Sequence, residues 1–169
     1  MTGKLELCPS LVSLNDVLTN IVGIVHPSAA SKQQTLDLEL RSRDLTLMAD
    51  GLRLQEAFWN LLANAVECTP ACGSIRVVLM HHAQTAVVVV TDDGAGIPAA
   101  LLPVIFDRVK IGRLGHGLAT AREVIDLHGG TIHAGSAGEN RGSTFTVTLP
   151  LHGMASGVAG HASGSLPRS

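Results

Sequence analysis

Residues 54–65 read LQEAFWNLLANA and carry two patterns at helical spacing. Apolar residues at positions 54, 58, 61, 62 and 65 fall on one side of a helix, which predicts a buried face. Glu56, Asn60 and Asn64 are spaced by four and form a stripe on another side of the same helix. We therefore expect a helix from Asp50 to about Thr69 that packs on one side and presents polar groups on another.

Strand patterns lie on both sides of this helix. Residues 75–80 and 87–90 are apolar runs, and the second is continuous in valine, which is typical of a central strand. Two further strands are predicted at 131–134 and 143–149, and two further helices at 13–30 and 118–127. Strands and helices are grouped rather than strictly alternating, so the fold class is an α/β two-layer sandwich. Its sheet is expected to be mixed, mainly antiparallel and covered on one face by helices.

Residues 36–40 alternate strictly between apolar and polar, and 45–48 follow after a charged turn. These two segments are predicted to pair as an antiparallel hairpin. The last segment, residues 152–169, is dominated by Gly, Ala, Ser and His without periodicity. We expect a single domain over 1–151 and a flexible linker or tail over 152–169.

Composition excludes several classes of protein. The net charge of -2 and the aromatic content of one Trp, three Phe and no Tyr argue against nucleic acid as a partner. Three cysteines cannot form a closed set of disulfides, and the sequence has no apolar run of about 18 residues. We expect a cytoplasmic location and no direct membrane contact.

Asp92, Gly94, Gly96 and Ile97 form a second motif, in which an acidic residue ends the valine strand. Glycines allow a sharp turn and a close approach of the backbone to a ligand. The carboxylate could then accept a hydrogen bond from an exocyclic amine such as that of adenine. The alternative is an ordinary Asp-Gly turn.

Gly112, Gly115 and Gly117 lead into the predicted helix at 118–127. Bare backbone N–H groups and the positive end of a helix dipole favour an anion there, and triphosphate fits best. The loop lacks the Lys-Ser/Thr ending of a P-loop and the preceding strand of a dinucleotide fingerprint.

The side-chain oxygens of Asn60 and Asn64 are hard ligands that suit Mg²⁺, and the Glu56 carboxylate could orient or deprotonate an attacking group. The alternative for this stripe is a solvated helix face. Cys68 and Cys72 are spaced like zinc ligands on a helix, but the sequence offers no second pair.

Four ordered segments together resemble the catalytic, ATP-binding domain of sensor histidine kinases, which belongs to the superfamily of gyrase, Hsp90, histidine kinase and MutL. These segments are 54–65, 92–98, 117–130 and 142–150. The resemblance covers roughly residues 10–151 and implies a Bergerat-type ATP-binding fold. The sequence after Phe145 is also similar to hybrid kinases, in which a receiver domain follows.

The resemblance also implies roles for individual residues. Glu56 and Asn60 would be catalytic, and Asn60 and Asn64 would hold Mg²⁺. ATP or ADP would be bound by Asn60, Asn64, Asp92, Gly94, Gly96, Ile97, Phe106, Gly112, Gly115, His116, Gly117, Leu118 and Thr144. The implied reaction transfers the γ-phosphate of ATP to a histidine on a separate dimerisation domain, with a response regulator or receiver domain as a further partner.

Two departures from the family pattern bear on activity. Glu67 and Cys68 stand where a basic and an aromatic residue are usual, which removes a cation expected near the phosphates. The segment between Phe106 and Gly115 is short, although Arg108, Lys110 and Arg113 could still pair with phosphate. A degenerate nucleotide-binding or docking module, or an anti-sigma-type serine kinase, therefore stays open as an alternative.

Overall fold

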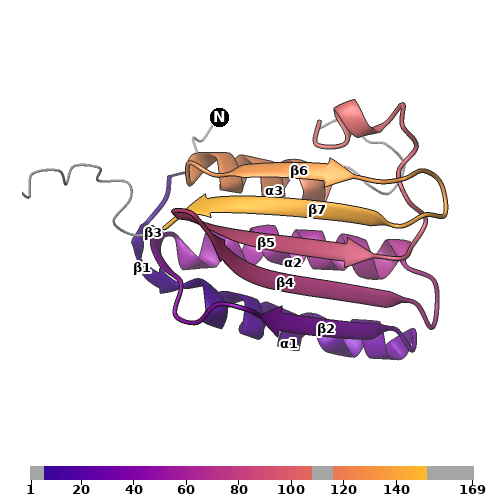
Figure 1. Ribbon diagram of the computed structural model, residues 1–169, viewed down its shortest axis with the longest axis horizontal. Helices are drawn as coiled ribbons and strands as arrows, with labels where there is room; N and C mark the ends of the chain where they lie inside the picture. Colours follow the sequence, from indigo (N-terminus) through magenta and orange to yellow (C-terminus); the bar gives the residue numbers. More distant parts are fainter. Residues whose placement is uncertain (1–5, 108–115, 152–169) are drawn as a thin grey trace, which may run out of the picture.

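The computed structural model describes residues 6–107 and 116–151, in which three helices cover one face of a five-stranded sheet (Figure 1). The helices are α1 (Leu14–Ser31), α2 (Gly51–Cys68) and α3 (His116–Leu127), with a short 3-10 helix η1 (Leu102–Val104). The strands are β1 (Ser10–Ser13), β2 (Thr35–Leu40), β3 (Thr46–Ala49), β4 (Ser74–His82), β5 (Thr85–Asp92), β6 (Thr131–Gly135) and β7 (Ser143–Pro150). None of the helices in the described ranges is both long and apolar enough to cross a membrane.

The strand order of the large sheet is β2-β4-β5-β7-β6. Only the β2–β4 pair is parallel, and the other three pairs are antiparallel. The valine-rich strand β5 lies in the middle, as its continuous apolar pattern predicts. The predicted two-layer α/β sandwich, with a mixed and mainly antiparallel sheet, is therefore confirmed.

The predicted hairpin of residues 36–40 and 45–48 is wrong. Strand β2 pairs with β4, whereas β3 pairs with β1 in a separate two-stranded sheet. The connection between β2 and β3 is held by helix α1, because the Asn15 amide donates to the Ser42 carbonyl at 2.7 Å and its oxygen accepts from the Leu45 N–H at 3.0 Å. Alternation identified both segments as strands, but alternation does not specify a partner.

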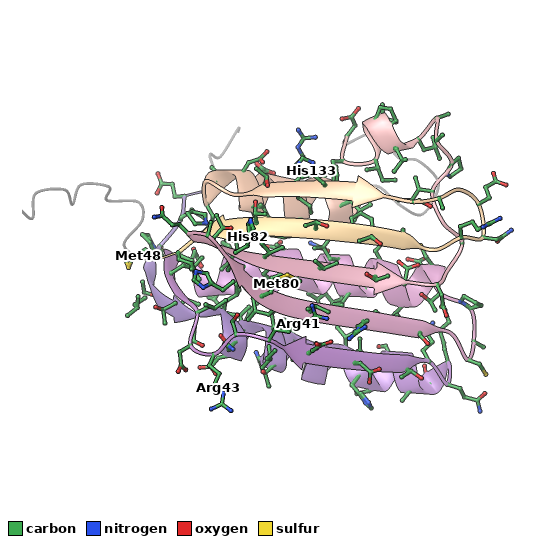
Figure 2. The ribbon with its side chains drawn as sticks, viewed as in Figure 1. Arg41, Arg43, Met48, Met80, His82 and His133 are labelled. Carbon is green, nitrogen blue, oxygen red and sulfur yellow. The ribbon has the colours of Figure 1, made fainter. Side chains whose placement is uncertain are left out.

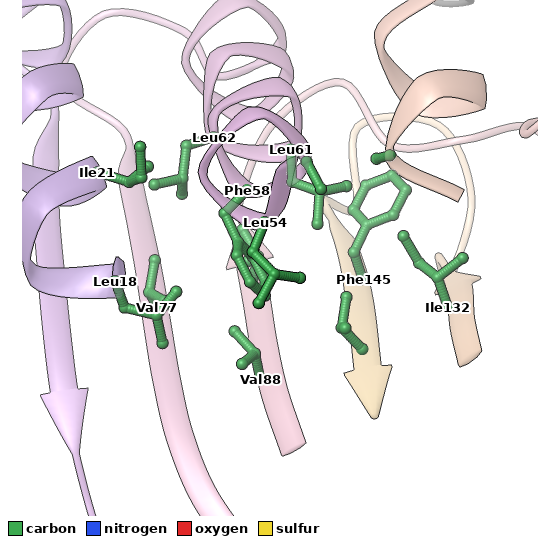
Figure 3. Close-up of a cluster of buried hydrophobic side chains, with 14 of the residues drawn as sticks. Leu18, Ile21, Leu54, Phe58, Leu61, Leu62, Val77, Val88, Ile132 and Phe145 are labelled. Atoms are coloured by element: carbon green, nitrogen blue, oxygen red, sulfur yellow. The ribbon is translucent and has the colours of Figure 1, made fainter. Parts of the chain in front are cut away.

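The core lies between the helices and the sheet, and the predicted apolar face of α2 is at its centre. Leu54, Phe58, Leu61 and Leu62 are each at most 1% exposed. Figure 3 shows these side chains above Val77, Val88 and Phe145 of the sheet, with Leu18 and Ile21 of α1 beside them. Burial of this face fixes the rotation of α2 about its axis, so the polar stripe faces away from the α2–sheet contact.

Side chains hold α2 at both ends. At its start, Asp50 accepts hydrogen bonds from the N–H groups of Arg53 at 3.2 Å and Cys8 at 2.9 Å. The Asp50 N–H donates to Nε2 of His128 at 2.9 Å, which joins the start of α2 to the end of α3. At the other end, Lys32 and Gln34 each donate to the carbonyls of Val66 and Thr69, at distances between 2.7 and 3.0 Å. The helix that carries the polar stripe is thus fixed in position.

Replacement of the capping residue, Asp50→Ala, should lower the free energy of unfolding by about 1 kcal/mol at neutral pH. Hydrogen bonding, first from Cys8 and also from Arg53, lowers the pKa of Asp50 against the opposing effect of burial. A carboxylate with a lowered pKa stabilises the fold above its ordinary pKa, and this contribution is lost as the pH falls through the folded-state value.

Urea denaturation of both proteins, at neutral pH and at successively more acidic pH, measures this effect. The difference in free energy of unfolding between the parent and Asp50→Ala should shrink as the acid protonates Asp50 in the parent. Asp126→Ala is the control, because Asp126 is exposed and pairs with the Arg122 guanidinium at the long distance of 3.6 Å. An equal loss of stability in both variants, or a difference that does not depend on pH, would contradict the capping role.

Candidate functional site

Asp92 ends strand β5 as a buried carboxylate, 4% exposed. The Ser143 hydroxyl donates to its Oδ2 at 2.7 Å, and the Gly94 N–H donates to its Oδ1 at 2.9 Å. Strand register places Ser143 directly opposite Asp92. Each carboxylate oxygen has the capacity for a second hydrogen bond, so the group is oriented by the protein and can still accept from a ligand.

The glycine turn after Asp92 is fixed between the end of α2 and the loop that joins β6 to β7. The Ala95 N–H donates to the Cys68 carbonyl at 3.0 Å. From the other side, the N–H groups of Asn140 and Gly142 donate to the carbonyls of Ala95 at 2.7 Å and Gly94 at 3.1 Å. The turn is therefore part of the rigid framework rather than a free surface loop.

The glycines of this turn are required by the protein's own backbone. A Cβ on Gly94 would lie 2.3 Å from the Cys68 carbonyl oxygen, and one on Gly96 would lie 2.0 Å from the Gly138 carbonyl oxygen. Gly96 also has a φ of +71°, which L residues rarely adopt. The sequence predicted glycines here because of the sharp turn and the close approach of a ligand. The structure gives a further reason: neighbouring backbone carbonyls leave no room for a Cβ at either position.

Gly96→Ala should therefore destabilise the fold by about 2 kcal/mol or more, because the added Cβ meets backbone that has to move and the φ is strained. Gly23→Ala is the matched control. A Cβ on Gly23, inside the exposed part of α1, meets nothing within 4 Å, so this substitution should stabilise the fold by about 0.5–1 kcal/mol. Chemical denaturation of the two variants should give effects of opposite sign, and effects of the same sign would contradict this account of the turn.

A small pocket lies beside this turn, with a volume of about 10 Å³. Four of its lining residues were predicted to bind the ligand: Asn64, Gly96, Ile97 and Leu118. The other four are Cys68, Ile105, Ser143 and Phe145. The walls are mainly apolar, and Ser143 connects the pocket to the Asp92 carboxylate. This combination suits a flat heteroaromatic ring that carries a hydrogen-bond donor at one edge.

Thr144 was predicted to bind the ligand but is not in this lining. Strand alternation turns it to the face of the sheet opposite Ser143 and Phe145, so its side chain points away from the helices and the pocket. Ser143, one residue earlier, lines the pocket, and the ligand contact predicted for Thr144 stays a prediction.

Phe106 was predicted to bind the ligand, and it packs against residues near the pocket without being part of its lining. Its ring makes an edge-on contact with Phe145, with ring centroids 6.1 Å apart, and the guanidinium of Arg122 lies 5.8 Å from its centre. The residue before it, Ile105, is 1% exposed and lines the pocket. The ligand contact predicted for Phe106 stays a prediction.

The polar stripe of α2 runs from the pocket towards the start of α3. Asn64 lines the pocket, and its Oδ1 accepts a weak hydrogen bond from the Cys68 thiol at 3.8 Å. Asn60, one turn earlier, faces Gly117, where a Cβ would lie 3.1 Å from the Asn60 Oδ1. Glu56 pairs with Arg53 at 3.1 Å and is partly exposed. The two asparagines are therefore at the pocket and at the start of α3, and Glu56 is farther along the stripe.

Several predicted residues fall outside the described ranges. These are Gly112 and Gly115 of the glycine loop and the basic residues Arg108, Lys110 and Arg113. The backbone of His116 begins α3, and its side chain is not described. The proposed tail at 152–169 also lies outside these ranges.

Glu67 is not in the pocket lining but lines a groove with Ile24 and Trp59 and a separate cavity at the end of α2. Burial, and then the negative charges of Asp92 and Glu67, raise the pKa of Cys68, which does line the pocket. The expected loss of a cation near the phosphates stays a prediction.

The other candidate metal sites find little support in the described residues. The Cys68 thiol bonds to Asn64, whereas that of Cys72 lies 3.5 Å from the Gln33 oxygen. Figure 2 shows His82 and His133 on the face of the sheet turned away from the helices. Over residues 6–107 and 116–151, no three His, Cys, Asp or Glu residues gather in a way that could hold a metal ion.

Sequence reasoning missed Ser143 and Ser136. The Ser136 hydroxyl accepts from the Ile97 N–H at 3.0 Å and donates to the Gly142 carbonyl at 2.7 Å, which fixes the pocket-lining loop to the β6–β7 loop. Ser143 could have been found from strand pairing, because it begins the strand next to the one that Asp92 ends. Ser136 carries no comparable signal, since the Ile97 N–H that it accepts from is 39 residues away in sequence.

The sequence of this chain matches a known protein family and curated relatives. Residues 49–153 match the family model described as histidine kinase-, DNA gyrase B-, and HSP90-like ATPase. The chain is 33% identical over 157 residues to the adaptive-response sensory kinase SasA of Synechococcus elongatus, covering 88% of this chain and 40% of that protein. It is 29% identical over 188 residues to hybrid signal transduction histidine kinase D of Dictyostelium discoideum, covering 88% of this chain and 12% of that protein.

Solved structures of histidine kinases have the same fold as this chain. The nucleotide-free catalytic domain of histidine kinase ThkA superposes with a TM-score of 0.79 at 25% identity, covering 85% of this chain and 98% of that one. Full-length ShkA in complex with AMPPNP shares the fold, with a TM-score of 0.80 at 24% identity over 89% of this chain and 32% of that one. The chain covers only 40% of the length of SasA and 12% of the length of histidine kinase D.

Proposed function

Because the chain belongs to the family of histidine kinase-, DNA gyrase B- and HSP90-like ATPases, we propose that it is the ATP-binding catalytic domain of a sensor histidine kinase. In this proposal it binds ATP and transfers the γ-phosphate to a histidine on a dimerisation domain outside this chain. Its curated relatives are histidine kinases, one of them hybrid, and each is longer than this chain.

The observation that carries the proposal is the buried carboxylate of Asp92 beside a mainly apolar pocket. Adenine offers an exocyclic amine that can donate to Asp92 and a flat apolar face that fits against Ile97, Ile105 and Leu118. Ser143 and the Gly94 N–H hold the carboxylate in place before the ligand arrives, so this group needs little reorganisation on binding. The pocket would have to widen to admit the base, and the ribose and phosphates would extend out of it.

The phosphates would lie towards the start of α3, where Asn60 meets Gly117. Glycine at 117 leaves the Asn60 amide oxygen uncovered, whereas a Cβ would lie 3.1 Å from it. This oxygen and that of Asn64 are the hard donors that Mg²⁺ prefers, so the residues present fit the ion. Bound Mg²⁺ would supply charge neutralisation for the triphosphate.

Phosphoryl transfer depends chiefly on position and charge, and it needs little acid or base chemistry from the protein. The N-terminal end of α3 contributes positive partial charge next to Asn60. Glu56 lies on the same stripe of α2, one turn before Asn60, where its carboxylate would orient the incoming acceptor. In this structure the Glu56 carboxylate pairs with the Arg53 guanidinium at 3.1 Å, so this ion pair would have to break or be shared when the acceptor binds.

We also propose a response regulator or receiver domain as the downstream partner. ThkA, a structural neighbour with 26% identity and a TM-score of 0.75, was solved in complex with the response regulator TrrA. The hybrid kinase among the relatives favours a receiver domain in the same polypeptide.

Calorimetric titration with a non-hydrolysable ATP analogue, with and without Mg²⁺, tests the proposal. Binding that is tighter in the presence of Mg²⁺ supports an ATP-dependent enzyme. Binding without any effect of Mg²⁺ supports a nucleotide-binding module instead, and absence of binding refutes both assignments. Transfer of labelled phosphate to a separately supplied dimerisation domain then tests the reaction itself.

A further inference from the structure

His128 joins the start of α2 to the end of α3, and the proposed reaction gives this residue no role. Its Nε2 accepts from the Asp50 N–H at 2.9 Å, across 78 residues of sequence. Its Nδ1 lies 2.7 Å from the carbonyl oxygen of Val124, one turn earlier in α3. The ring therefore bridges two helices that meet only in the tertiary structure.

The two partners of this ring fix its protonation state. A carbonyl oxygen can only accept, so Nδ1 must carry the proton, and a backbone N–H can only donate, so Nε2 must offer its lone pair. His128 is therefore bound as a neutral imidazole in the Nδ1–H tautomer. An imidazolium carries an N–H on both nitrogens, so protonation would leave the Asp50 N–H facing a second donor.

The bridge lies at one end of the contact between α2 and α3, which pack side by side. At the other end Asn60 faces Gly117, where a Cβ would lie 3.1 Å from the Asn60 Oδ1. Asn60 is ten residues after Asp50, and His128 is eleven residues after Gly117. At about 1.5 Å per helical residue these separations are about 15 and 16.5 Å, so the two helices run antiparallel with matched ends.

The spacing of the two helices at Asn60 decides where the phosphate end of the proposed site lies. Gly117 has no side chain that could set this distance by its own packing, so the distance depends on how the rest of α3 is held. The directional hydrogen bond at His128 supplies such a constraint. A displacement of about 1 Å in a positioning contact is enough to impair phosphoryl transfer strongly.

The charged groups near this ring, among the described residues, come from three segments. Asp50 and Arg53 lie at the start of α2, Asp126 lies near the end of α3, and Glu6 belongs to the segment before β1 that bonds to Asp50. Carboxylates and guanidinium groups ordinarily stay charged near neutral pH, whereas imidazole changes its charge there. The Asp50 carboxylate would attract an imidazolium, but its oxygens already accept from two backbone N–H groups.

We propose that His128 is a positioning residue for the phosphate end of the site. As a neutral ring it holds α3 at the distance from α2 at which Asn60 and the start of α3 act on the triphosphate together. Protonation of the ring breaks this link, so mild acid weakens the binding of ATP. This inference rests on the proposed function, since it requires that the phosphates lie between Asn60 and α3.

The test measures the Kd of a non-hydrolysable ATP analogue with Mg²⁺ at about pH 5.5 and about pH 8, and takes the ratio of the two values for each protein. Titration of the nucleotide itself contributes equally to every ratio. The Gln amide offers one donor and one acceptor side by side, as the neutral ring does, but it does not change charge. The ratio of the parent should therefore exceed that of His128→Gln by roughly two- to tenfold, the range that one hydrogen bond gives.

Two further variants separate the hydrogen bonds from other effects. His128→Phe keeps a ring without either nitrogen, so its ratio should match that of His128→Gln, while its affinity at about pH 8 should fall by roughly two- to tenfold. His133→Gln removes an exposed imidazole of β6, on the face of the sheet turned away from the helices, and should keep the ratio of the parent. Nitrogen-15 NMR of the free parent at about pH 8 should show the His128 proton on Nδ1.

The outcomes distinguish failure of this inference from failure of the proposed function. Equal ratios in the parent and His128→Gln, or a proton on Nε2 in the NMR spectrum, would refute the role of His128 and leave the nucleotide site standing. The same holds if His128→Phe binds the analogue as the parent does, or if His133→Gln loses the pH dependence. The comparison of the parent with His128→Gln decides the matter even where His128→Phe does not fold. A parent that binds no analogue at about pH 8 overturns both proposals.

Discussion

Asp92→Asn should weaken binding of ATP and ADP at least tenfold. The carboxylate is proposed to accept a charge-assisted hydrogen bond from the adenine amine, and bonds of this kind contribute roughly 1.5–3 kcal/mol. The fold should survive, because the amide keeps an oxygen for the Gly94 N–H and can donate to the Ser143 hydroxyl in place of the present bonds. Calorimetric titration of both proteins measures the loss.

The same substitution should reduce the preference for ATP over GTP. Guanine carries a carbonyl where adenine carries the amine, so a carboxylate repels it, whereas the amide introduced by the substitution would offer an N–H. Asp37→Asn is the matched control, because Asp37 undergoes the same loss of charge at an exposed position of β2. Unchanged nucleotide affinity in Asp92→Asn, with a normal melting transition, would show that the base does not bind at this carboxylate.

Asn60→Ala should reduce Mg²⁺-dependent phosphoryl transfer by at least about a hundredfold. Metal-ion stabilisation of the transferred phosphoryl group is worth several kcal/mol, and each 1.36 kcal/mol is about tenfold in rate. Loss of the amide oxygen should also remove the increase in affinity for the ATP analogue that Mg²⁺ gives to the parent. Transfer to a supplied dimerisation domain and titration at two Mg²⁺ concentrations measure the two effects.

The fold should persist in Asn60→Ala, because the substituted side chain lies on the polar stripe and not among the buried residues of α2. Asn20→Ala is the control: Asn20 is an exposed helical asparagine whose amide donates to the Gln55 oxygen at 3.3 Å. It should keep both the transfer rate and the response to Mg²⁺. If Asn60→Ala transfers phosphate at the parent rate, the proposed role of Asn60 is refuted, and if it loses its cooperative melt, the loss of activity has a structural cause.

The sequence by itself predicted the features that depend on local periodicity. The apolar positions of α2 indicated its buried face, and the valine run indicated the central strand β5, because burial on one side or on both sides leaves a direct pattern in the residues. The same periodicity placed Asn60 and Asn64 on the opposite side of α2. The site motif at Asp92 was also visible, because an acidic residue followed by two glycines ends the valine run, although an ordinary Asp-Gly turn gives the same pattern.

Tertiary structure alone decided which distant residues meet. Alternation marked β2 and β3 as strands but could not show that they belong to different sheets, since their partners are chosen by packing across the molecule. Alternation also could not show that Ser143 rather than Thr144 reaches Asp92. That contact depends on the register between β5 and β7, and a shift of one residue would turn the other side chain to the helix-covered face. The position of the glycine turn follows from the hydrogen bond of the Ala95 N–H to the Cys68 carbonyl at the end of α2, a contact between segments that local sequence patterns do not relate.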